Sequence, residues 1–248
     1  MMGTVSALWR HPIKAHGRES VGHVSLVEGQ TFPWDRRYAV AHERAKTEGG
    51  EWARCVNFSR AAGAPSLQAI TAKVDEATGK ITLQHPDLWE LTFDPETQGD
   101  KLIDWVRPIM PKDRAASAKL VPAGEFGMTD SPFPSIAIHT TASHRAIEGR
   151  LGRKLATERW RGNIWLDGFA PWEEFDWIGK TLRIGDAEIE VRERITRCKA
   201  TTANTDTGVR DADTLGVLNE AFGHQDFGVY GVVTKSGDIA VGNTAEVL

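Results

Sequence analysis

The first half of the chain alternates apolar and polar residues over short stretches that glycine and proline separate. Such alternation is typical of half-buried β-strands. It predicts strands at 4–10, 24–27, 38–41, 67–74, 81–84 and 88–93. Ala77-Thr78-Gly79-Lys80 predicts a hairpin turn between two of these strands. A single short helix is expected at 100–106.

The second half continues the same pattern and adds two helices. Strands are expected at 135–139, 163–166, 181–184, 188–195, 227–234 and 238–241. Gly185-Asp186 and Ser236-Gly237 predict tight hairpins between neighbouring strands. One helix is expected at 141–151, with Thr141 as its N-cap and Gly152 after its end. The other is expected at 214–222, between Asp213 and Gly223.

Short strands at close spacing favour a barrel or a sandwich over a parallel α/β sheet. Five prolines between Pro108 and Pro134 indicate a junction between two parts. We therefore predict a mainly β protein with a few helices. An N-terminal β-barrel-like region at 1–115 would precede a β-barrel domain at 116–248.

Composition narrows the possible partners. Of the 248 residues, 40% are hydrophobic and 26% are charged, as in ordinary globular proteins. The net charge of −4 argues against a nucleic-acid partner, which demands a large basic excess, but not against a local basic pocket. No apolar run approaches the ~20 residues that span a bilayer, and the first residues do not resemble a signal peptide. We expect a cytoplasmic protein with no membrane partner.

Only two cysteines, Cys55 and Cys198, occur in the chain, and no C-x-x-C pair is present. This excludes a zinc ribbon or an iron–sulfur cluster of the chain's own. None of the eight histidines belongs to an H-x-H or H-E-x-x-H pattern, which argues against a conventional zinc hydrolase. Cys55 is expected to be packed or half-exposed.

Cys198 lies between two cations, Arg197 and Lys199, in a polar stretch. Neighbouring cations favour the thiolate, which is the reactive and metal-binding form of cysteine. The alternative is a spectator thiol beside solvated charges.

Four segments bring hydrogen-bond donors to predicted loop ends. They are Pro12-Ile13-Lys14, residues 35–38, residues 159–163 and the loop that follows Cys198. Arg159 and Arg161 would share a face if the strand at 163 extends back to them. Charge-assisted hydrogen bonds of ~1.5–3 kcal/mol each would hold an anionic cofactor, and a thiolate would add a soft metal ligand. Phosphate plus a soft metal therefore fits this set, provided that the segments meet in space.

Taken together, these segments resemble the MOSC family, the domain shared with the C-terminal part of molybdenum-cofactor sulfurases. In layout the chain is similar to the amidoxime-reducing molybdenum proteins, in which a MOSC N-terminal β-barrel region precedes the MOSC domain. The resemblance spans nearly the whole chain. Its carriers are Pro12-Ile13-Lys14, Asp35-Arg36, Arg159-Trp160-Arg161-Gly162-Asn163-Ile164, Trp177-Ile178-Gly179, Ile184-Gly185, Arg197-Cys198, Thr201-Thr202, Asp206-Thr207-Gly208, Phe227-Gly228-Val229-Tyr230 and Val241-Gly242.

The resemblance implies a set of site residues. Cys198 would be the catalytic residue and would bind molybdenum through its thiolate. The pterin and its phosphate would be held by Lys14, Arg36, Arg161 and Asn163, and Thr201 and Thr202 would lie beside the metal cysteine. The implied cofactor is the molybdenum cofactor, and pyridoxal phosphate is not expected.

The resemblance also implies a molybdenum-dependent oxidoreductase that reduces N-hydroxylated small molecules, N–OH to N–H, with two electrons and two protons. Because the chain has no iron–sulfur motif, the electrons would come from a separate flavin or ferredoxin-type donor. Two other functions stay open at this point. The same cysteine could serve a sulfur (persulfide) or molybdenum-cofactor carrier, or the chain could be a cofactor-free β-barrel interaction module.

Three positions depart from the family pattern. Ala15 stands where a serine is usual, and Asn204 stands where the D-P-x-T-G motif has its first acid. The R-F-R-P-N-I pattern has Gly162 in place of its proline, which we expect to loosen the loop. We expect cofactor binding to survive these changes better than a specific reaction does.

Overall fold

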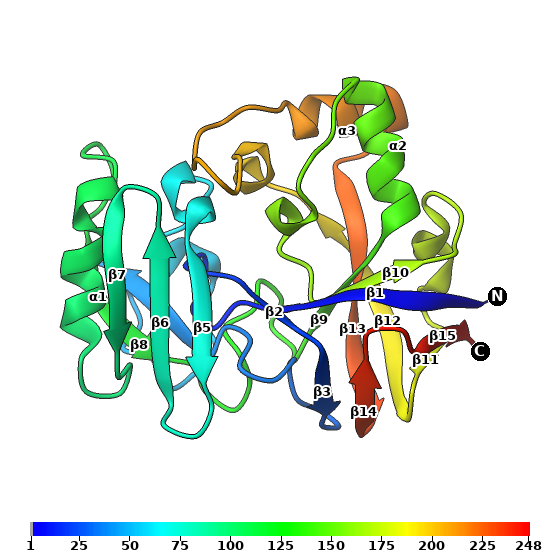
Figure 1. The fold of residues 1–248 in the computed structure, drawn as a ribbon, viewed down its shortest axis with the longest axis horizontal. Coiled ribbons are helices and arrows are strands. Elements are labelled where there is room, and N and C mark those ends of the chain that lie inside the picture. The colour runs from blue at the N-terminus through cyan, green and yellow to red at the C-terminus, as the bar shows by residue number, and fades with distance from the viewer. Residues whose placement is uncertain (1) are drawn as a thin grey trace.

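The computed structural model describes residues 2–248 and confirms a mainly β fold, with three α-helices in that range (Figure 1). The strands are β1 (Met2–Arg10), β2 (Glu19–Val21), β3 (His23–Leu26), β4 (Tyr38–His42), β5 (Thr71–Asp75), β6 (Lys80–His85), β7 (Leu88–Phe93), β8 (Ser117–Pro122), β9 (Ile136–Thr140), β10 (Ile164–Asp167), β11 (Thr181–Ile184), β12 (Ala187–Thr196), β13 (Asp226–Lys235), β14 (Gly237–Ala240) and β15 (Thr244–Val247). The helices are α1 (Gly99–Val106), α2 (Thr141–Leu151) and α3 (Thr214–Phe222). Within the described range, no helix is both long and apolar enough to cross a bilayer.

Seven strands close into a barrel in the order β1, β10, β9, β13, β12, β11, β15 and back to β1. Only the β9–β10 pair among them is parallel. β1 comes from the start of the chain but pairs with β10 and β15, so both ends of the chain lie at the barrel (Figure 1). The barrel therefore includes one strand, β1, from the predicted N-terminal region 1–115. The domain boundary at residue 115 stays a prediction.

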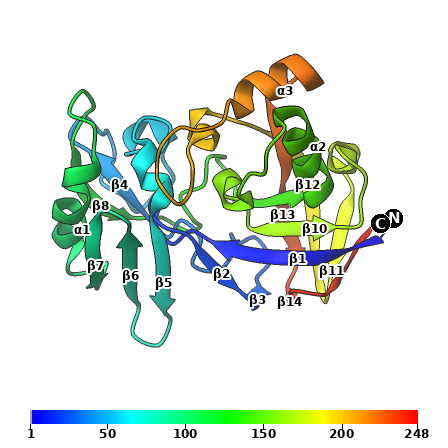
Figure 2. The ribbon, with the colours of Figure 1, turned by 45° about the horizontal axis from the view of Figure 1, so that its top comes forward.

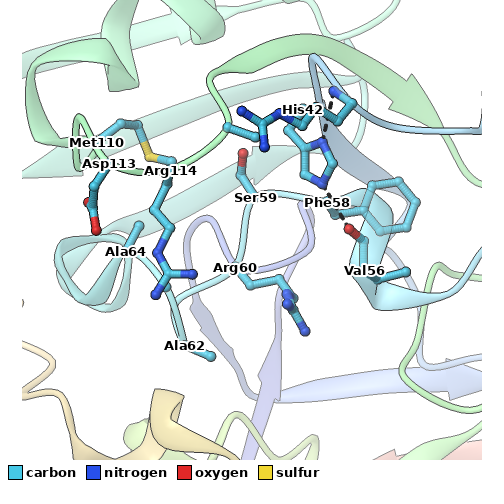
Figure 3. Close-up of a pocket in the computed structure, with 13 residues that line it drawn as sticks. His42, Val56, Phe58, Ser59, Arg60, Ala62, Ala64, Met110, Asp113 and Arg114 are labelled. Atoms are coloured by element: carbon cyan, nitrogen blue, oxygen red, sulfur yellow. Dashed lines mark hydrogen bonds between the residues drawn. The ribbon is translucent and has the colours of Figure 1, made fainter.

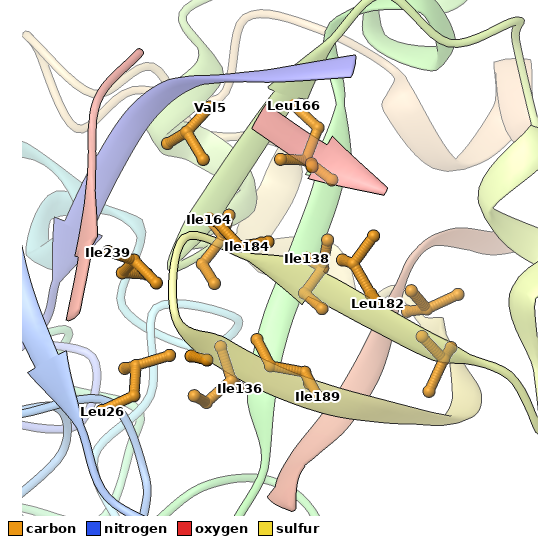
Figure 4. Close-up of a cluster of buried hydrophobic side chains, with 14 of the residues drawn as sticks. Val5, Leu26, Ile136, Ile138, Ile164, Leu166, Leu182, Ile184, Ile189 and Ile239 are labelled. Carbon is orange, nitrogen blue, oxygen red and sulfur yellow. The ribbon is translucent and has the colours of Figure 1, made fainter. Parts of the chain in front are cut away.

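Alternate residues of the barrel strands point inward and form one apolar core (Figure 4). Val5, Ile138, Ile164 and Ile189 are each at most 1% exposed. All five residues of β9 are buried, because the strand lies between the barrel interior and α2. Burial on both faces explains why this strand reads as a nearly continuous apolar run in the sequence.

A second lobe holds most of the first half of the chain (Figure 2). It contains the sheet β5–β6–β7, the pair β4–β8 and helix α1, which packs on β7 and β8. Leu102, Trp105 and Val106 of α1 are buried in its core against Ile81 and Phe93. The lobe has its own apolar core, so the chain has two packed bodies with a boundary on which polar loops can meet.

Most of the predicted elements are confirmed, and the helix ends agree closely with the sequence. Thr140, one residue before the predicted cap, accepts the backbone N–H of Ser143 at the start of α2. Gly152 ends that helix with a φ of 68°, a left-handed conformation that glycine adopts without a steric penalty. Asp213 caps α3 by accepting the N–H of Gly216.

Two predictions about strands are wrong. The last strand does not form a hairpin with β13, because β14 crosses to pair with β3, where Ile239 lies opposite Val24. The chain turns at Gly237, where a Cβ atom would lie 2.4 Å from the backbone nitrogen of Ala187. The predicted strand at 67–74 begins as a 3-10 helix, η2 (Pro65–Ala69), since Pro65 favours the first turn of a helix.

Glu174 should make stability depend on pH. Its carboxyl is fully buried behind α2, accepts bonds from the hydroxyls of Thr140 and Ser143, and has a pKa that burial raises from 4.5 to about 6. Because the pKa of this carboxyl is higher in the folded than in the unfolded chain, the folded state favours its protonated form. The contribution of Glu174 to the free energy of unfolding therefore decreases as pH rises from 4.5 to 6. Glu174→Gln should match the wild type near pH 4.5 and exceed it by about 2 kcal/mol at pH 7.5 in urea unfolding. A difference that is constant with pH would contradict this.

Candidate functional site

A cavity of about 450 Å³ lies between the two lobes. Its lining includes Lys14 and Arg36 from the first half of the chain and Arg161, Cys198 and Thr201 from the second. These residues come from all four segments that the sequence singled out. The structure therefore meets the condition that the segments lie together in space.

Cys198 follows the end of β12 and lies before a short 3-10 helix, η6 (Lys199–Thr202). Its side chain is exposed, and its carbonyl accepts the N–H and the hydroxyl of Thr201, at 3.2 and 3.1 Å. These bonds hold the backbone of the loop and leave the sulfur open to the cavity. The thiol is therefore accessible, as a reactive or metal-binding cysteine must be.

Arg197 lies beside this thiol and is surrounded by neutral acceptors. Its guanidinium donates to the carbonyl of Phe227 at 2.9 and 2.6 Å, to the carbonyl of Trp160 at 3.0 Å, and to Nε2 of His139. Burial lowers the pKa of Arg197 to about 10, so it stays charged at neutral pH. Its charge lacks an anionic partner among residues 2–248 and favours an anion beside Cys198.

Asp35 orients Arg36. The Asp35 carboxylate accepts the backbone N–H of His11 at 2.8 Å and Nδ1–H of its ring at 3.0 Å, and its other oxygen pairs with Arg36. Burial and the charge of Arg161 lower the pKa of His11 to about 3, so the neutral ring is the donor to Asp35. Arg36 in turn donates to the carbonyl of Arg161 at 3.2 Å, which brings the two arginines together.

Arg161 carries a second uncompensated charge. Its guanidinium donates to the carbonyl of Gly17 at 3.2 Å, and burial together with the charge of Arg36 lowers its pKa to about 9. Arg161, Arg36 and Ala15 have φ values of 52°, 52° and 64°, so three of the five non-glycine left-handed residues within 2–248 line this cavity. Such strained backbone clusters at ligand sites.

Lys14 is at the cavity, but its ammonium is saturated. It donates to the carbonyls of Met128 and Thr129, at 2.8 and 3.1 Å, and to the Asp130 carboxylate at 2.6 Å. Desolvation alone would raise the pKa of Asp130, but Lys14 lowers it to about 2. The Asp130 side chain is 60% exposed, so it can turn away. Lys14 can contact a bound anion only by exchanging a partner.

Two predicted ligands, Asn163 and Thr202, are not among the residues that line the cavity. Asn163 is 1% exposed, accepts the N–H of Ala137 at 3.0 Å and donates to the carbonyl of Trp9 at 3.2 Å. It ties β9 to β1, and Arg161 precedes it by two residues. Thr202 donates to the carbonyl of Lys199 at 2.8 Å and accepts from Arg210. These bonds fix the loops on which both residues lie, and their role as ligands stays a prediction.

The strand at 163 does not extend back to Arg159, because β10 begins at Ile164, so the condition for a face shared by Arg159 and Arg161 is not met. Arg159 belongs to a 3-10 helix, η4 (Thr157–Trp160), and its buried guanidinium donates to the carbonyl of Thr201 at 3.0 Å and to Asp211 at 3.2 Å. Asp211 also accepts the amide of Asn204 at 2.9 Å, so a carboxylate is present beside the position where the motif has lost its acid. Arg159 therefore fixes the loop after Cys198.

Sequence reasoning missed several lining residues, among them Asp130, Arg60, Cys55 and Tyr230. Counted over its lining, the cavity has seven lysine and arginine residues and only two carboxylates, Asp130 and Glu193. A chain of net charge −4 therefore gathers positive charge at one place. This charge fits a phosphate, and the open thiol adds the soft donor that molybdenum or another soft metal accepts. The residues present thus fit a phosphate-bearing metal cofactor.

Comparison with known proteins gives two domain matches. The MOSC domain matches residues 130–246, and the MOSC N-terminal beta barrel domain matches residues 2–111. Among solved structures, the YuaD protein of Bacillus subtilis shares the fold with a TM-score of 0.50 at 12% identity, over 100% of this chain and 96% of its own. YiiM of Geobacillus stearothermophilus matches over 46% of this chain and 53% of its own, with 18% identity and a TM-score of 0.35. No curated protein sequence matches the chain.

Proposed function

Because the chain belongs to the MOSC-domain proteins with a MOSC N-terminal β-barrel domain, we propose that it binds the molybdenum cofactor and reduces N-hydroxylated compounds, N–OH to N–H. One observation carries the proposal. The exposed thiol of Cys198 lies in the same cavity as the guanidinium groups of Arg161 and Arg197, neither of which forms an ion pair within the described part of the chain.

The predicted site residues that line the cavity have distinct roles in this proposal. Arg36 and Arg161 would hold the phosphate, with Lys14 joining them once Asp130 turns away. Cys198 would ligate molybdenum through its thiolate, which Arg197 stabilises by charge. Thr201 would keep the Cys198 loop in place through its bond to the carbonyl of that residue. When bound, the cofactor supplies the two-electron redox chemistry.

The protein binds and orients the substrate and contributes protons. Reduction of N–OH to N–H consumes two electrons and two protons and releases water. Tyr230, whose pKa burial raises, keeps its phenolic proton in the cavity at neutral pH. We place the reaction in the cytoplasm, where Cys55 and Cys198 stay as free thiols, and assign the electrons to a separate flavin or ferredoxin-type protein.

The exposure of Cys198 also favours a second candidate function, a carrier of sulfur or of the molybdenum cofactor. Transfer to another protein demands a thiol that the partner can reach, and Cys198 meets that demand. A carrier would hold the cofactor loosely or bear a persulfide on Cys198, which adds about 32 Da to the chain.

Metal and pterin analysis of the natively expressed protein tests these functions. We expect close to one molybdenum atom and one pterin per chain, together with turnover of an amidoxime when reduced methyl viologen supplies electrons. A labile cofactor with a sulfur adduct on Cys198 would favour the carrier. Denatured protein that releases no pterin would contradict both and would leave an interaction module.

A further inference from the structure

A second hollow of about 380 Å³ adjoins the cavity on the first-half lobe (Figure 3). We call it the arginine hollow, because Arg44, Arg60 and Arg114 line it. It shares Arg60 and Ala62 with the cofactor cavity, so the two spaces meet at these residues. Figure 3 shows Arg60 and Arg114 on the same part of the lining, with the Arg60 side chain directed away from Arg114. None of the roles proposed above uses this hollow.

The hollow has more positively charged than negatively charged side chains in its lining. Its lining has three guanidinium groups and one carboxylate, that of Asp113. Within residues 2–248, neither Arg60 nor Arg114 makes an ion pair, and Arg60 contacts only the sulfur of Cys55 through its side chain, at 3.4 Å. Arg44 has a distant and exposed partner in Glu43, at 3.8 Å. Three such guanidinium groups around one small space favour a carboxylate or a phosphate.

The wall of the hollow is tied to the segment that carries the thiol. Arg210 donates to the carbonyl of Ala62 at 2.8 Å and to the carbonyl of Lys199 at 2.5 Å, and Lys199 follows Cys198 directly. Arg210 therefore joins the wall of the hollow to the residue that follows the thiol. The size of the hollow suits a small anionic group and not a protein surface.

We propose that the arginine hollow binds the carboxylate or phosphate of an N-hydroxylated substrate whose N–OH end lies at Cys198. This inference rests on the proposed function and names a substrate class for it, the anionic N-hydroxylated compounds. Arg36 and Arg161 already serve the phosphate of the cofactor, so the hollow offers a separate set of cations. A cofactor that carries a nucleotide would be the other source of an anion here.

Two matched probes test the substrate class. Benzamidoxime is neutral, and 4-carboxybenzamidoxime adds one carboxylate. Arg44→Gln/Arg114→Gln removes two arginines that line the hollow but not the cofactor cavity. It should lower kcat/KM for the carboxylated probe by about tenfold or more and leave the value for benzamidoxime within about twofold. Arg107→Gln removes an exposed arginine that pairs with Asp104 outside the hollow, and it should change neither value. Equal losses for both probes would overturn the inference.

Binding without turnover separates this inference from the proposed function. 4-Carboxybenzamide has no N–OH bond to reduce, and benzamide is its neutral control. Calorimetry on the full cofactor-loaded chain should show that the double variant weakens binding of 4-carboxybenzamide about tenfold. If neither amidoxime is reduced but this weakening occurs, the hollow stands and the reductase proposal fails. A nucleotide on the released cofactor that the double variant loses would assign the hollow to the cofactor and overturn the substrate class.

Discussion

Serine in place of Cys198 should lower the molybdenum bound per chain by about 100-fold or more and abolish N-hydroxy reduction. A serine hydroxyl does not ionise at neutral pH, and its oxygen is a hard donor, whereas a thiolate is a soft one. Loss of a directly bound ligand should exceed the 10- to 100-fold loss typical of residues that only support a ligand. The fold should persist, because the side chain is exposed and the loop is held by its backbone carbonyl.

Cys55→Ser is the matched control for this experiment. It makes the same chemical change in the same cavity lining, next to Arg60 instead of Arg197. We expect its molybdenum content, measured by mass spectrometry of the metal, to stay within twofold of the wild type. Wild-type content in Cys198→Ser combined with loss in Cys55→Ser would transfer the ligand assignment to Cys55. Loss in both variants would indicate that the two thiols act together.

The fold follows largely from local patterns that the sequence displays. The alternation at 188–195 predicts a long strand, and β12 indeed ends two residues before Cys198. The caps of α2 and α3 are read from single residues such as Gly152 and Asp213, because helix ends are local structures. The pairing of β14 with β3 cannot be predicted from local patterns, because a turn at Gly237 does not specify which distant strand pairs with the segment that follows it. Pairing partners depend on long-range packing.

The residues of the candidate site are also partly predictable from local motifs and partly dependent on long-range packing. Arg161 and Cys198 lie in recognisable motifs, and the cavity lining contains both. Asp130 and Arg60 carry no local signal, since they reach the cavity only because the two lobes pack together. The family resemblance implies that Asn163 is a ligand, but both polar atoms of its side-chain amide have backbone partners in the structure. A motif identifies a loop, but only the packing decides which of its side chains face the ligand.

Gly162 shows how a departure from a family pattern can be a requirement of this chain. Its Cα lies against the ring of His139, and a Cβ atom at this position would be 1.9 Å from Nδ1 of that ring. Gly228 packs on the other side, where a Cβ atom would be 2.0 Å from Cδ2. The ring is fully buried between the two glycines and accepts from Arg197. The glycine therefore makes room for His139, and the expectation that it loosens the loop stays a prediction.

Gly162→Ala should consequently destabilise the protein by about 3 kcal/mol and displace Arg197 from its place beside Cys198. Gly149→Ala is the control, because it lies in α2 with no atom within 4 Å of the new Cβ, and it should be neutral or slightly stabilising.

The double variant Gly162→Ala/His139→Ala isolates the steric cause. Removal of the ring gives the new methyl group space, so the two changes should cost about 2 kcal/mol less together than the sum of their separate costs in urea unfolding. If the losses in the free energy of unfolding are additive, the loop at Gly162 moves aside without a clash between the new methyl group and His139. Molybdenum content distinguishes the two roles of the ring, because His139→Ala alone should also weaken cofactor retention by releasing Arg197. The double variant should hold as little molybdenum as His139→Ala, since no acceptor replaces Nε2 of His139.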